Sequence, residues 1–218
     1  MLPIESRLRR MFAEQIVAII RANSPERALD AAHTLIRAGF KLIEITLTIP
    51  GAPEVIKALA DSAPAEVMIG AGTVMSAVGA RDCITQGAQF IVSPICETDI
   101  IRPCREAGVV AIPAGLSATE IVHAWRLGAH VVKVFPVGTV GGPAYIKALR
   151  GPLPDIPLWV SGMVIPAQAP EYTRAGAQLV GLGSDQLLPA HLVEAGDWEE
   201  IATHAHAVLL TAKGIREI

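Results

Sequence analysis

Short apolar runs alternate along this chain with stretches that have the spacing of amphipathic helices, at a period of roughly 20–25 residues. The predicted strands are residues 16–20, 42–47, 67–71, 90–93, 109–113, 131–135, 158–161 and 179–183. The predicted helices between them are residues 25–38, 52–60, 76–86, 98–107, 117–127, 142–149 and 167–175. Because parallel strands need long crossover connections, this alternation predicts βαβ units and a parallel sheet.

The number of predicted strands favours one α/β architecture over another. An open doubly wound sheet commonly has about five or six strands, whereas eight strands fit a closed (β/α)8 barrel, the TIM barrel. We expect residues 4–15 to form an extra N-terminal helix that covers the barrel bottom, and residues 198–213 to form or extend the eighth helix. Because no linker or low-complexity region interrupts the series, residues 1–218 are expected to form a single domain.

Local signals support these helix boundaries. Predicted N-caps stand at Ser24, Ser76, Thr98 and Ser117, and Ser117 is followed three residues later by Glu120, the pattern of a capping box. Glycines stand just after several of the predicted helices, where a left-handed residue commonly ends a helix.

Composition excludes several classes of function. The chain has a net charge of −3 with scattered charges, so it offers no electrostatic footprint for nucleic acid or an anionic membrane. Its three cysteines lack CxxC spacing and its six histidines have no ligand-spaced partners, which argues against disulfides and a metal site. The first residues lack the apolar core of a signal peptide, and no apolar run approaches the ~18 residues that span a bilayer. We therefore expect a cytoplasmic protein.

Lys133 lies in the middle of an otherwise apolar predicted strand. Burying an ammonium group is costly, and desolvation lowers the lysine pKa toward a neutral amine that can attack a carbonyl and form a Schiff base. Taken alone, the lysine could also reach solvent or pair with a carboxylate.

Glu44 is predicted to face the same barrel interior. Period-two alternation puts Glu44, Thr46 and Thr48 on one face of their strand and bulky apolar residues on the face toward the helices. The same alternation turns Lys133 inward. A lysine and a carboxylate in one cavity suit an imine mechanism, in which the carboxylate moves protons. The alternative is a structural ion pair, which contributes little net stability because desolvation offsets attraction.

The last two predicted strands end in turns that could bind an anion. Ser161 and Gly162 close one strand, and the GLGS segment at 181–184, with Gly183 and Ser184, closes the next, before a helical run that starts near Asp185. In a (β/α)8 barrel these loops commonly hold a phosphate through backbone N–H groups. Glycine-rich turns alone are a weak signal, because glycine there can serve tight packing.

Five motifs together resemble the 2-keto-3-deoxy-6-phosphogluconate (KDPG) and 6-phosphogalactonate (KDPGal) aldolases, some of which also cleave 4-hydroxy-2-oxoglutarate. They are EITL at 44–47, GAGTV at 70–74, FIVSP at 90–94, VKVFP at 132–136 and GP at 151–152. The resemblance implies a class I, metal-independent aldolase that acts on a small molecule without a cofactor and is usually a homotrimer of (β/α)8 barrels.

The resemblance also implies roles for single residues. Lys133 matches the Schiff-base lysine and Glu44 the general acid/base. Thr73 matches a threonine that binds the pyruvate carboxylate.

Other positions match the walls of the family's substrate pocket. Pro94 and Phe135 match residues around the pyruvyl group, and Arg21 matches an arginine near the substrate. Gly162 and Ser184 match parts of the phosphate site.

Three residues depart from the family pattern. Thr48 replaces an arginine that usually holds the substrate carboxylate, so a neutral hydrogen bond is expected there in place of a charge-assisted one. Met163 replaces a glycine of the phosphate loop, which is expected to prevent a positive φ and to disturb the anion site. Ile95 places a bulkier side chain than the usual glycine at the pocket mouth.

The resemblance therefore implies cleavage of a 2-keto-3-deoxy-6-phospho sugar acid to pyruvate and glyceraldehyde 3-phosphate. Two alternatives stay open. The first is cleavage of the non-phosphorylated 4-hydroxy-2-oxoglutarate to pyruvate and glyoxylate, and the second is a non-catalytic barrel that binds a phosphorylated metabolite. The sequence does not distinguish the stereochemical series of the substrate.

Overall fold

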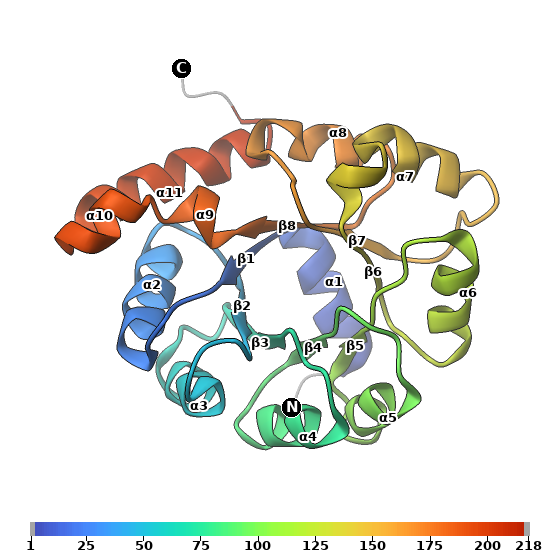
Figure 1. Cartoon of the computed structure of the whole chain (residues 1–218), viewed down its shortest axis with the longest axis horizontal. Coiled ribbons are helices and arrows are strands. Elements are labelled where there is room, and N and C mark those ends of the chain that lie inside the picture. Colours follow the sequence, from blue (N-terminus) through green and yellow to red (C-terminus); the bar gives the residue numbers. More distant parts are fainter. Residues whose placement is uncertain (1–2, 216–218) are drawn as a thin grey trace.

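The computed structural model describes residues 3–215, in which eight parallel strands form the wall of a barrel surrounded by helices (Figure 1). The strands are β1 (Ile16–Ile20), β2 (Leu42–Thr46), β3 (Met68–Gly72), β4 (Phe90–Val92), β5 (Val110–Ile112), β6 (Val132–Val134), β7 (Leu158–Val160) and β8 (Leu179–Gly183). The predicted (β/α)8 architecture is confirmed, and each predicted strand is present within one or two residues of its expected bounds.

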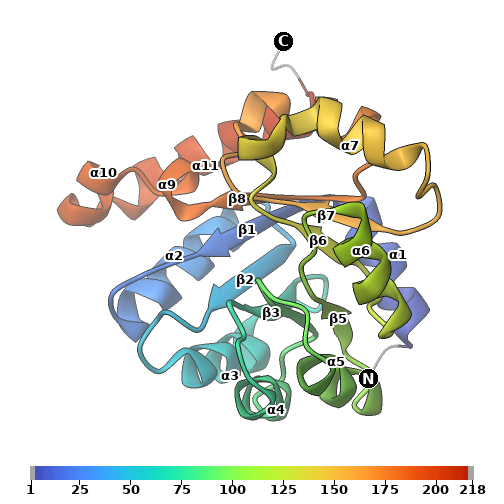
Figure 2. The ribbon, with the colours of Figure 1, turned by 45° about the vertical axis from the view of Figure 1, so that its right-hand side comes forward.

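The helices also follow the predicted order. They are α1 (Ile4–Glu14), α2 (Pro25–Arg37), α3 (Ala52–Ser62), α4 (Ala77–Thr85), α5 (Thr98–Glu106), α6 (Ala118–Arg126), α7 (Gly142–Arg150), α8 (Ala169–Arg174), α9 (Ser184–Leu187), α10 (Ala190–Ala195) and α11 (Trp198–Ala212). Two 3-10 turns, η1 (Val137–Val140) and η2 (Pro166–Gln168), precede α7 and α8. The short helix α10 was not predicted from the sequence; with α11 it extends past the barrel wall beside α2 (Figures 1 and 2).

Three of the four predicted N-caps are confirmed. Ser24 and Ser76 accept hydrogen bonds from the third residue of their helices, and Ser117 forms a reciprocal capping box with Glu120. The prediction for Thr98 was wrong, because Glu97 is the N-cap and Thr98 is the first helical residue. Glycines in the left-handed region follow α2, α4, α5, α6 and α8 as predicted; they are Gly39, Gly87, Gly108, Gly128 and Gly176.

The sheet order β5-β4-β3-β2-β1-β8-β7-β6 leaves β5 and β6 at its two edges. Backbone hydrogen bonds join these edges beyond the end of β5. The amide of Lys133 donates to the Pro113 carbonyl oxygen at 2.9 Å, and the amide of Gly115 donates to the Lys133 carbonyl oxygen at 2.9 Å. The backbone of Lys133 therefore helps to close the barrel, together with the amides of His130 and Val131, which donate to the Ala111 carbonyl oxygen.

Two apolar cores lie on opposite faces of the strands. The interior core includes Val17, Leu42, Phe90 and Trp159, whereas residues such as Ile43 pack outward against the helices. This division confirms the predicted alternation on β2, in which the bulky residues meet the helices.

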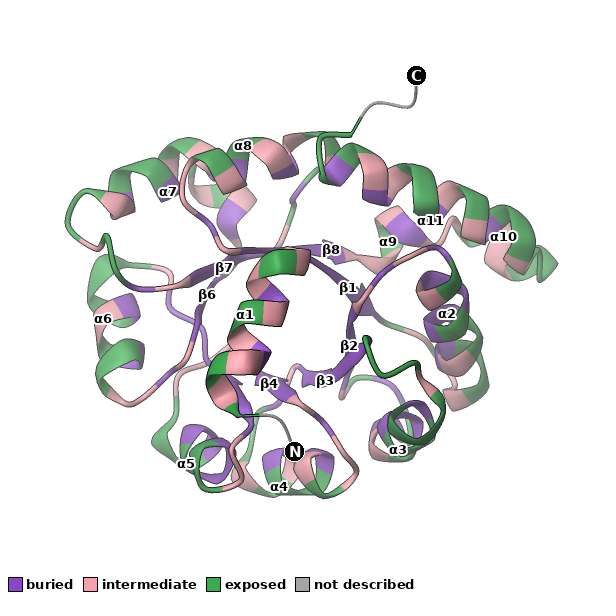
Figure 3. Ribbon diagram, turned by 180° about the vertical axis from the view of Figure 1, so that it is seen from behind, coloured by how far each residue is buried: buried purple, intermediate pink, exposed green. Residues whose placement is uncertain are grey.

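The helix α1 lies across one end of the barrel, as Figure 3 shows. Met11 of this helix belongs to the interior core, and buried Arg7 donates a hydrogen bond to the Gly108 carbonyl oxygen. The opposite end, where the strands have their carboxyl ends, is not covered by α1, and in barrels of this kind it is the end that carries functional sites. No helix within residues 3–215 is long and apolar enough to cross a membrane.

Candidate active site

Lys133 on β6 extends into the barrel as predicted and is only 5% exposed. Its Nζ lies 4.9 Å from the centroid of the Phe135 ring, an arrangement in which the ring face stabilises a positive charge. Burial lowers the pKa of Lys133, the nearby Glu44 charge opposes this shift, and Arg21 adds to it. The side chain is therefore a buried amine whose neutral form is more accessible than that of a surface lysine.

Glu44 on β2 is 1% exposed and extends across Gly72 of the neighbouring strand. A Cβ atom built on Gly72 would lie 1.7 Å from Oε1 of Glu44, so glycine is required for the carboxylate to occupy this place. The other oxygen, Oε2, has no hydrogen-bond partner among the residues that the structure describes. Burial raises the pKa of Glu44, and the positive charges of Lys133 and Arg21 oppose this shift.

Lys133 and Glu44 share the barrel interior without forming a direct ion pair. Among residues 3–215, no salt bridge within 4.0 Å joins them, although each charge shifts the pKa of the other. A structural pair would offset the cost of burial by direct contact. The two side chains are therefore coupled electrostatically without being held together by a direct ion pair.

Arg21 directly follows β1 and contacts two threonines on neighbouring strand ends. Its Nη1 donates to Oγ1 of Thr48 at 3.3 Å, and its Nη2 donates to Oγ1 of Thr73 at 3.5 Å. Thr73 has a φ of 56°, an uncommon value for a β-branched residue. Three residues predicted to bind the substrate therefore lie together at the barrel mouth.

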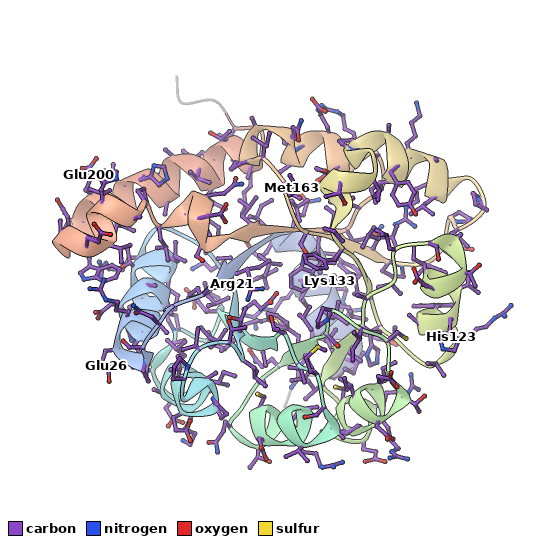
Figure 4. The ribbon with its side chains drawn as sticks, in the orientation of Figure 1. Arg21, Glu26, His123, Lys133, Met163 and Glu200 are labelled. Carbon is purple, nitrogen blue, oxygen red and sulfur yellow. The ribbon has the colours of Figure 1, made fainter. Side chains whose placement is uncertain are left out.

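A cavity of about 230 Å³, the central cavity, opens above Lys133. Five predicted site residues line it, namely Arg21, Lys133, Phe135, Ser161 and Gly162. Figure 4 shows Arg21 and Lys133 within the ring of strands and Met163 on the loop that follows β7. Among the residues that line this cavity, Arg21 and Lys133 are the cations.

Two further predicted residues, Ser184 and Pro94, line adjoining cavities, whereas Glu44, Thr48 and Thr73 line neither these nor the central cavity. Ser184 lines a cavity of about 470 Å³, the Ser184 cavity, which shares Arg21 with the central one. Pro94 and Ile95 line a cavity of about 580 Å³, which shares Phe135 with the central one. Within the described chain, no three His, Cys, Asp or Glu side chains gather into a group that could hold a metal ion.

The loop after β7 corrects one expectation. Gly162 and Met163 both have positive φ values, 85° and 57°, so the methionine does not prevent the left-handed conformation that glycine would adopt. A Cβ on Gly162 would lie 2.8 Å from the Phe135 ring, which explains why glycine is required there. Met163 is 71% exposed, and this open position leaves room for its side chain despite the unfavourable backbone.

Asp185 is a charged group near the predicted anion site that sequence reasoning did not identify as a site residue. It lines both the central cavity and the Ser184 cavity, and its Oδ1 would lie 2.3 Å from a Cβ built on Gly183. Its carboxylate therefore folds over the loop that was expected to hold a phosphate. The available signal was its position directly after Ser184.

Comparison with known proteins agrees with this geometry. Residues 4–204 match the family model for KDPG and KHG aldolases. The chain belongs to this family. Its homologues are named aldolases, so the chain belongs to a family of enzymes in the lyase class.

Two curated relatives are similar over most of the chain. A 2-dehydro-3-deoxy-phosphogluconate aldolase of Pseudoalteromonas atlantica is 33% identical over 92% of this chain and 92% of its own length. A 2-dehydro-3-deoxy-6-phosphogalactonate aldolase of Escherichia coli is 36% identical over 82% of this chain and 87% of its own.

Solved structures show the same barrel. A native KDPGal structure aligns with a TM-score of 0.79 at 32% identity, over 92% of this chain and 96% of that one. A KDPG aldolase of Legionella pneumophila, with pyruvate captured as a covalent carbinolamine, aligns with a TM-score of 0.82 at 26% identity, over 92% of this chain and 97% of that one.

Met163→Gly should stabilise the fold, because a non-glycine residue in the left-handed region costs roughly 1–2 kcal/mol, of which the higher chain entropy of glycine offsets a part. We expect the midpoint of urea unfolding to rise, with an increase in unfolding free energy of about 0.5–1 kcal/mol. Met163→Ala is the matched control, since it shortens the side chain and keeps the strain. An equal gain in both variants would show that the side chain, and not the backbone, causes the effect.

Proposed function

We propose that this protein is a class I aldolase that cleaves a 2-keto-3-deoxy acid through a Schiff base on Lys133 and releases pyruvate. The observation that carries the proposal is a buried lysine with a lowered pKa that lines a cavity together with Arg21, while the Glu44 carboxylate lies in the same interior without pairing directly with it. Membership of the KDPG and KHG aldolase family supports this chemistry.

In the proposed reaction, the neutral amine of Lys133 attacks the ketone carbon of the substrate and forms a carbinolamine. Loss of water gives an iminium ion, which acts as an electron sink. Glu44 accepts the proton of the hydroxyl on carbon 4, and the bond between carbons 3 and 4 breaks to release an aldehyde. The electron pair of that bond forms an enamine on Lys133. Protonation of carbon 3 and hydrolysis of the imine then release pyruvate and restore the free amine.

The pKa shifts suit these roles. Desolvation raises the pKa of Glu44 and lowers that of Lys133, so the pKa of each group is closer to neutral pH than it would be in water. The amine and the carboxylate thereby become an effective nucleophile and an effective proton carrier in the same barrel interior.

The remaining site residues bind the substrate in this proposal. Thr73 and Arg21 lie at the carboxylate end, and Pro94 and Phe135 form the wall around the pyruvyl group. Ser161 follows β7 and is 2% exposed, with no hydrogen-bond partner for its Oγ among the described residues. This hydroxyl is available to a polar group of the bound substrate.

We propose a 2-keto-3-deoxy-6-phospho sugar acid as the substrate, so that the aldehyde product is glyceraldehyde 3-phosphate. The names of the curated relatives support a phosphorylated substrate. Gly162 and Ser184 are the proposed phosphate contacts. The Asp185 carboxylate should weaken the preference for phosphate through like-charge repulsion, which keeps 4-hydroxy-2-oxoglutarate as the second candidate.

We also propose that residues 1–218 work as one domain in a cytoplasmic homotrimer. The oligomeric proposal is supported by a structural neighbour, a protein cage designed by fusing symmetric oligomeric domains, with a TM-score of 0.82 at 33% identity. That alignment covers 92% of this chain and 72% of the neighbour.

Borohydride reduction in the presence of pyruvate should attach a reduced pyruvyl group to Lys133. Peptide mass mapping checks the site, and the reaction should proceed equally with EDTA because no metal takes part. Lys133→Met should abolish the adduct, whereas Lys147→Met, which removes an exposed lysine on α7, should leave it unchanged. No adduct in the wild type would favour the non-catalytic barrel.

Glu44→Gln should lower turnover by roughly 100-fold or more, which is typical of a positioned acid–base group. The same variant should move the pH dependence of pyruvate trapping to lower pH. The Glu44 charge opposes the lowering of the pKa of Lys133, so its removal lets that pKa fall further, and the neutral amine then predominates from a lower pH. Glu171→Gln on α8 is an exposed control. A shift of the profile to higher pH would contradict the assigned coupling.

Preference for a phosphorylated substrate should be modest, on the order of tenfold in kcat/KM over the free acid. Asp185→Asn removes the negative charge at this end and should increase the preference several-fold. Glu194→Gln is the matched control, because Glu194 lines the Ser184 cavity but not the central cavity. Equal cleavage of both substrates by the wild type and the Asp185 variant would favour 4-hydroxy-2-oxoglutarate as the substrate.

A further inference from the structure

We propose that Thr48 does not bind the substrate but positions Arg21, which alone supplies the positive charge for the substrate carboxylate. The proposal rests on the aldolase function argued above and replaces the direct hydrogen bond from Thr48 that the sequence suggested. It follows from the direction of a short chain of hydrogen bonds between β1 and β2.

The series of hydrogen bonds ends at a backbone carbonyl oxygen, which can only accept a hydrogen bond. Oγ1 of Thr46 lies 2.9 Å from the carbonyl oxygen of Ile20, and Thr46 is fully buried. A carbonyl oxygen has no proton to give, so Thr46 donates its single hydroxyl proton to Ile20.

The hydrogen bond from Thr46 to Ile20 determines the direction of the hydrogen bond between Thr46 and Thr48. Oγ1 of Thr46 and Oγ1 of Thr48 lie 2.8 Å apart, a distance at which one hydroxyl must donate to the other. Because Thr46 has already used its proton, Thr48 is the donor. The proton of Thr48 is thereby directed to Thr46 and is not free for a carboxylate.

The lone pairs of the Thr48 hydroxyl accept a hydrogen bond from Arg21. An arginine guanidinium has donors and no acceptor, and Nη1 of Arg21 lies 3.3 Å from Oγ1 of Thr48. The three hydrogen bonds therefore run in one direction, from Arg21 through Thr48 and Thr46 to the backbone of Ile20. The strand end that carries Thr48 presents an acceptor, which attracts a cation and repels a carboxylate.

Arg21 needs such a constraint because it lines two cavities. It faces the central cavity with Lys133 and also the Ser184 cavity, and Asp185 lines both. A long arginine side chain has several rotamers, and Asp185 offers a competing negative charge. The acceptors on Thr48 and Thr73 hold two nitrogens of the guanidinium group at the mouth of the barrel. Its other N–H groups remain for the substrate.

This arrangement also explains how the site works with threonine at position 48. Lys133 becomes part of the imine, so among the residues lining the central cavity Arg21 is the cation left for a carboxylate. A charge-assisted hydrogen bond from an oriented guanidinium is worth about twice a neutral one. Thr48 thus influences the affinity for the substrate carboxylate through Arg21.

The test is a double-mutant cycle on pyruvate imine formation, measured by borohydride trapping against pyruvate concentration. Thr48→Val keeps the shape and removes the acceptor, so half-saturation should need roughly fivefold more pyruvate, the effect of losing about 1 kcal/mol. The trapping rate at saturation should change less than twofold, and Thr48→Ser should restore the wild-type value. Thr48→Ala serves if the valine variant does not fold.

The second half of the cycle uses Arg21→Met. In that background, Thr48→Val should have almost no further effect, because there is no guanidinium left to position. An undiminished effect of Thr48→Val without Arg21 would show direct contact with the substrate and overturn the proposal. If both variants weaken only phosphorylated substrates and leave pyruvate unaffected, Arg21 binds phosphate and the proposal also fails. Absence of any imine in the wild type would instead overturn the aldolase function on which it rests.

Discussion

The barrel closes at the residue that is proposed to do its chemistry. The two edge strands β5 and β6 are joined in part by two hydrogen bonds, one from the Lys133 amide to the Pro113 carbonyl oxygen and one from the Gly115 amide to the Lys133 carbonyl oxygen. Closure fixes the backbone of the lysine and directs its side chain into the barrel interior, where only 5% of the residue is exposed. The same closure therefore produces the lowered pKa of the amine and its fixed position.

Charge inside the barrel is distributed so that no two groups neutralise each other by direct contact. Arg21 influences the pKa of both Lys133 and Glu44, and these two influence the pKa of each other, yet within residues 3–215 no salt bridge joins any two of the three side chains. Direct pairing would stabilise the resting charges and make proton transfer harder. Desolvation dominates the shifts of both Lys133 and Glu44, so the site depends more on burial than on ion pairing.

Backbone geometry provides the space that these side chains need. Gly72 leaves room for the Glu44 carboxylate, and Gly162 leaves room for the Phe135 ring. Thr73 and Met163 take left-handed conformations although they are not glycines. Strained residues of this kind are common at functional sites, because the surrounding structure holds them in place. Here they lie on the loops after β3 and β7, at the end of the barrel that carries the proposed chemistry.

The sequence by itself determined the eight strands, the helices between them and the inward direction of Lys133 and Glu44. These features depend on local periodicity, since residues two apart in a strand share a face whatever the rest of the chain does. Only the tertiary structure decided which groups meet at the barrel mouth. Arg21 contacts Thr48 from 27 residues away and Thr73 from 52 residues away. Such contacts depend on the relative positions of strand ends, which are set by how the whole barrel closes. Only the structure likewise shows that the Asp185 carboxylate lines both the central cavity and the Ser184 cavity, because those cavities are formed by residues far apart in the sequence.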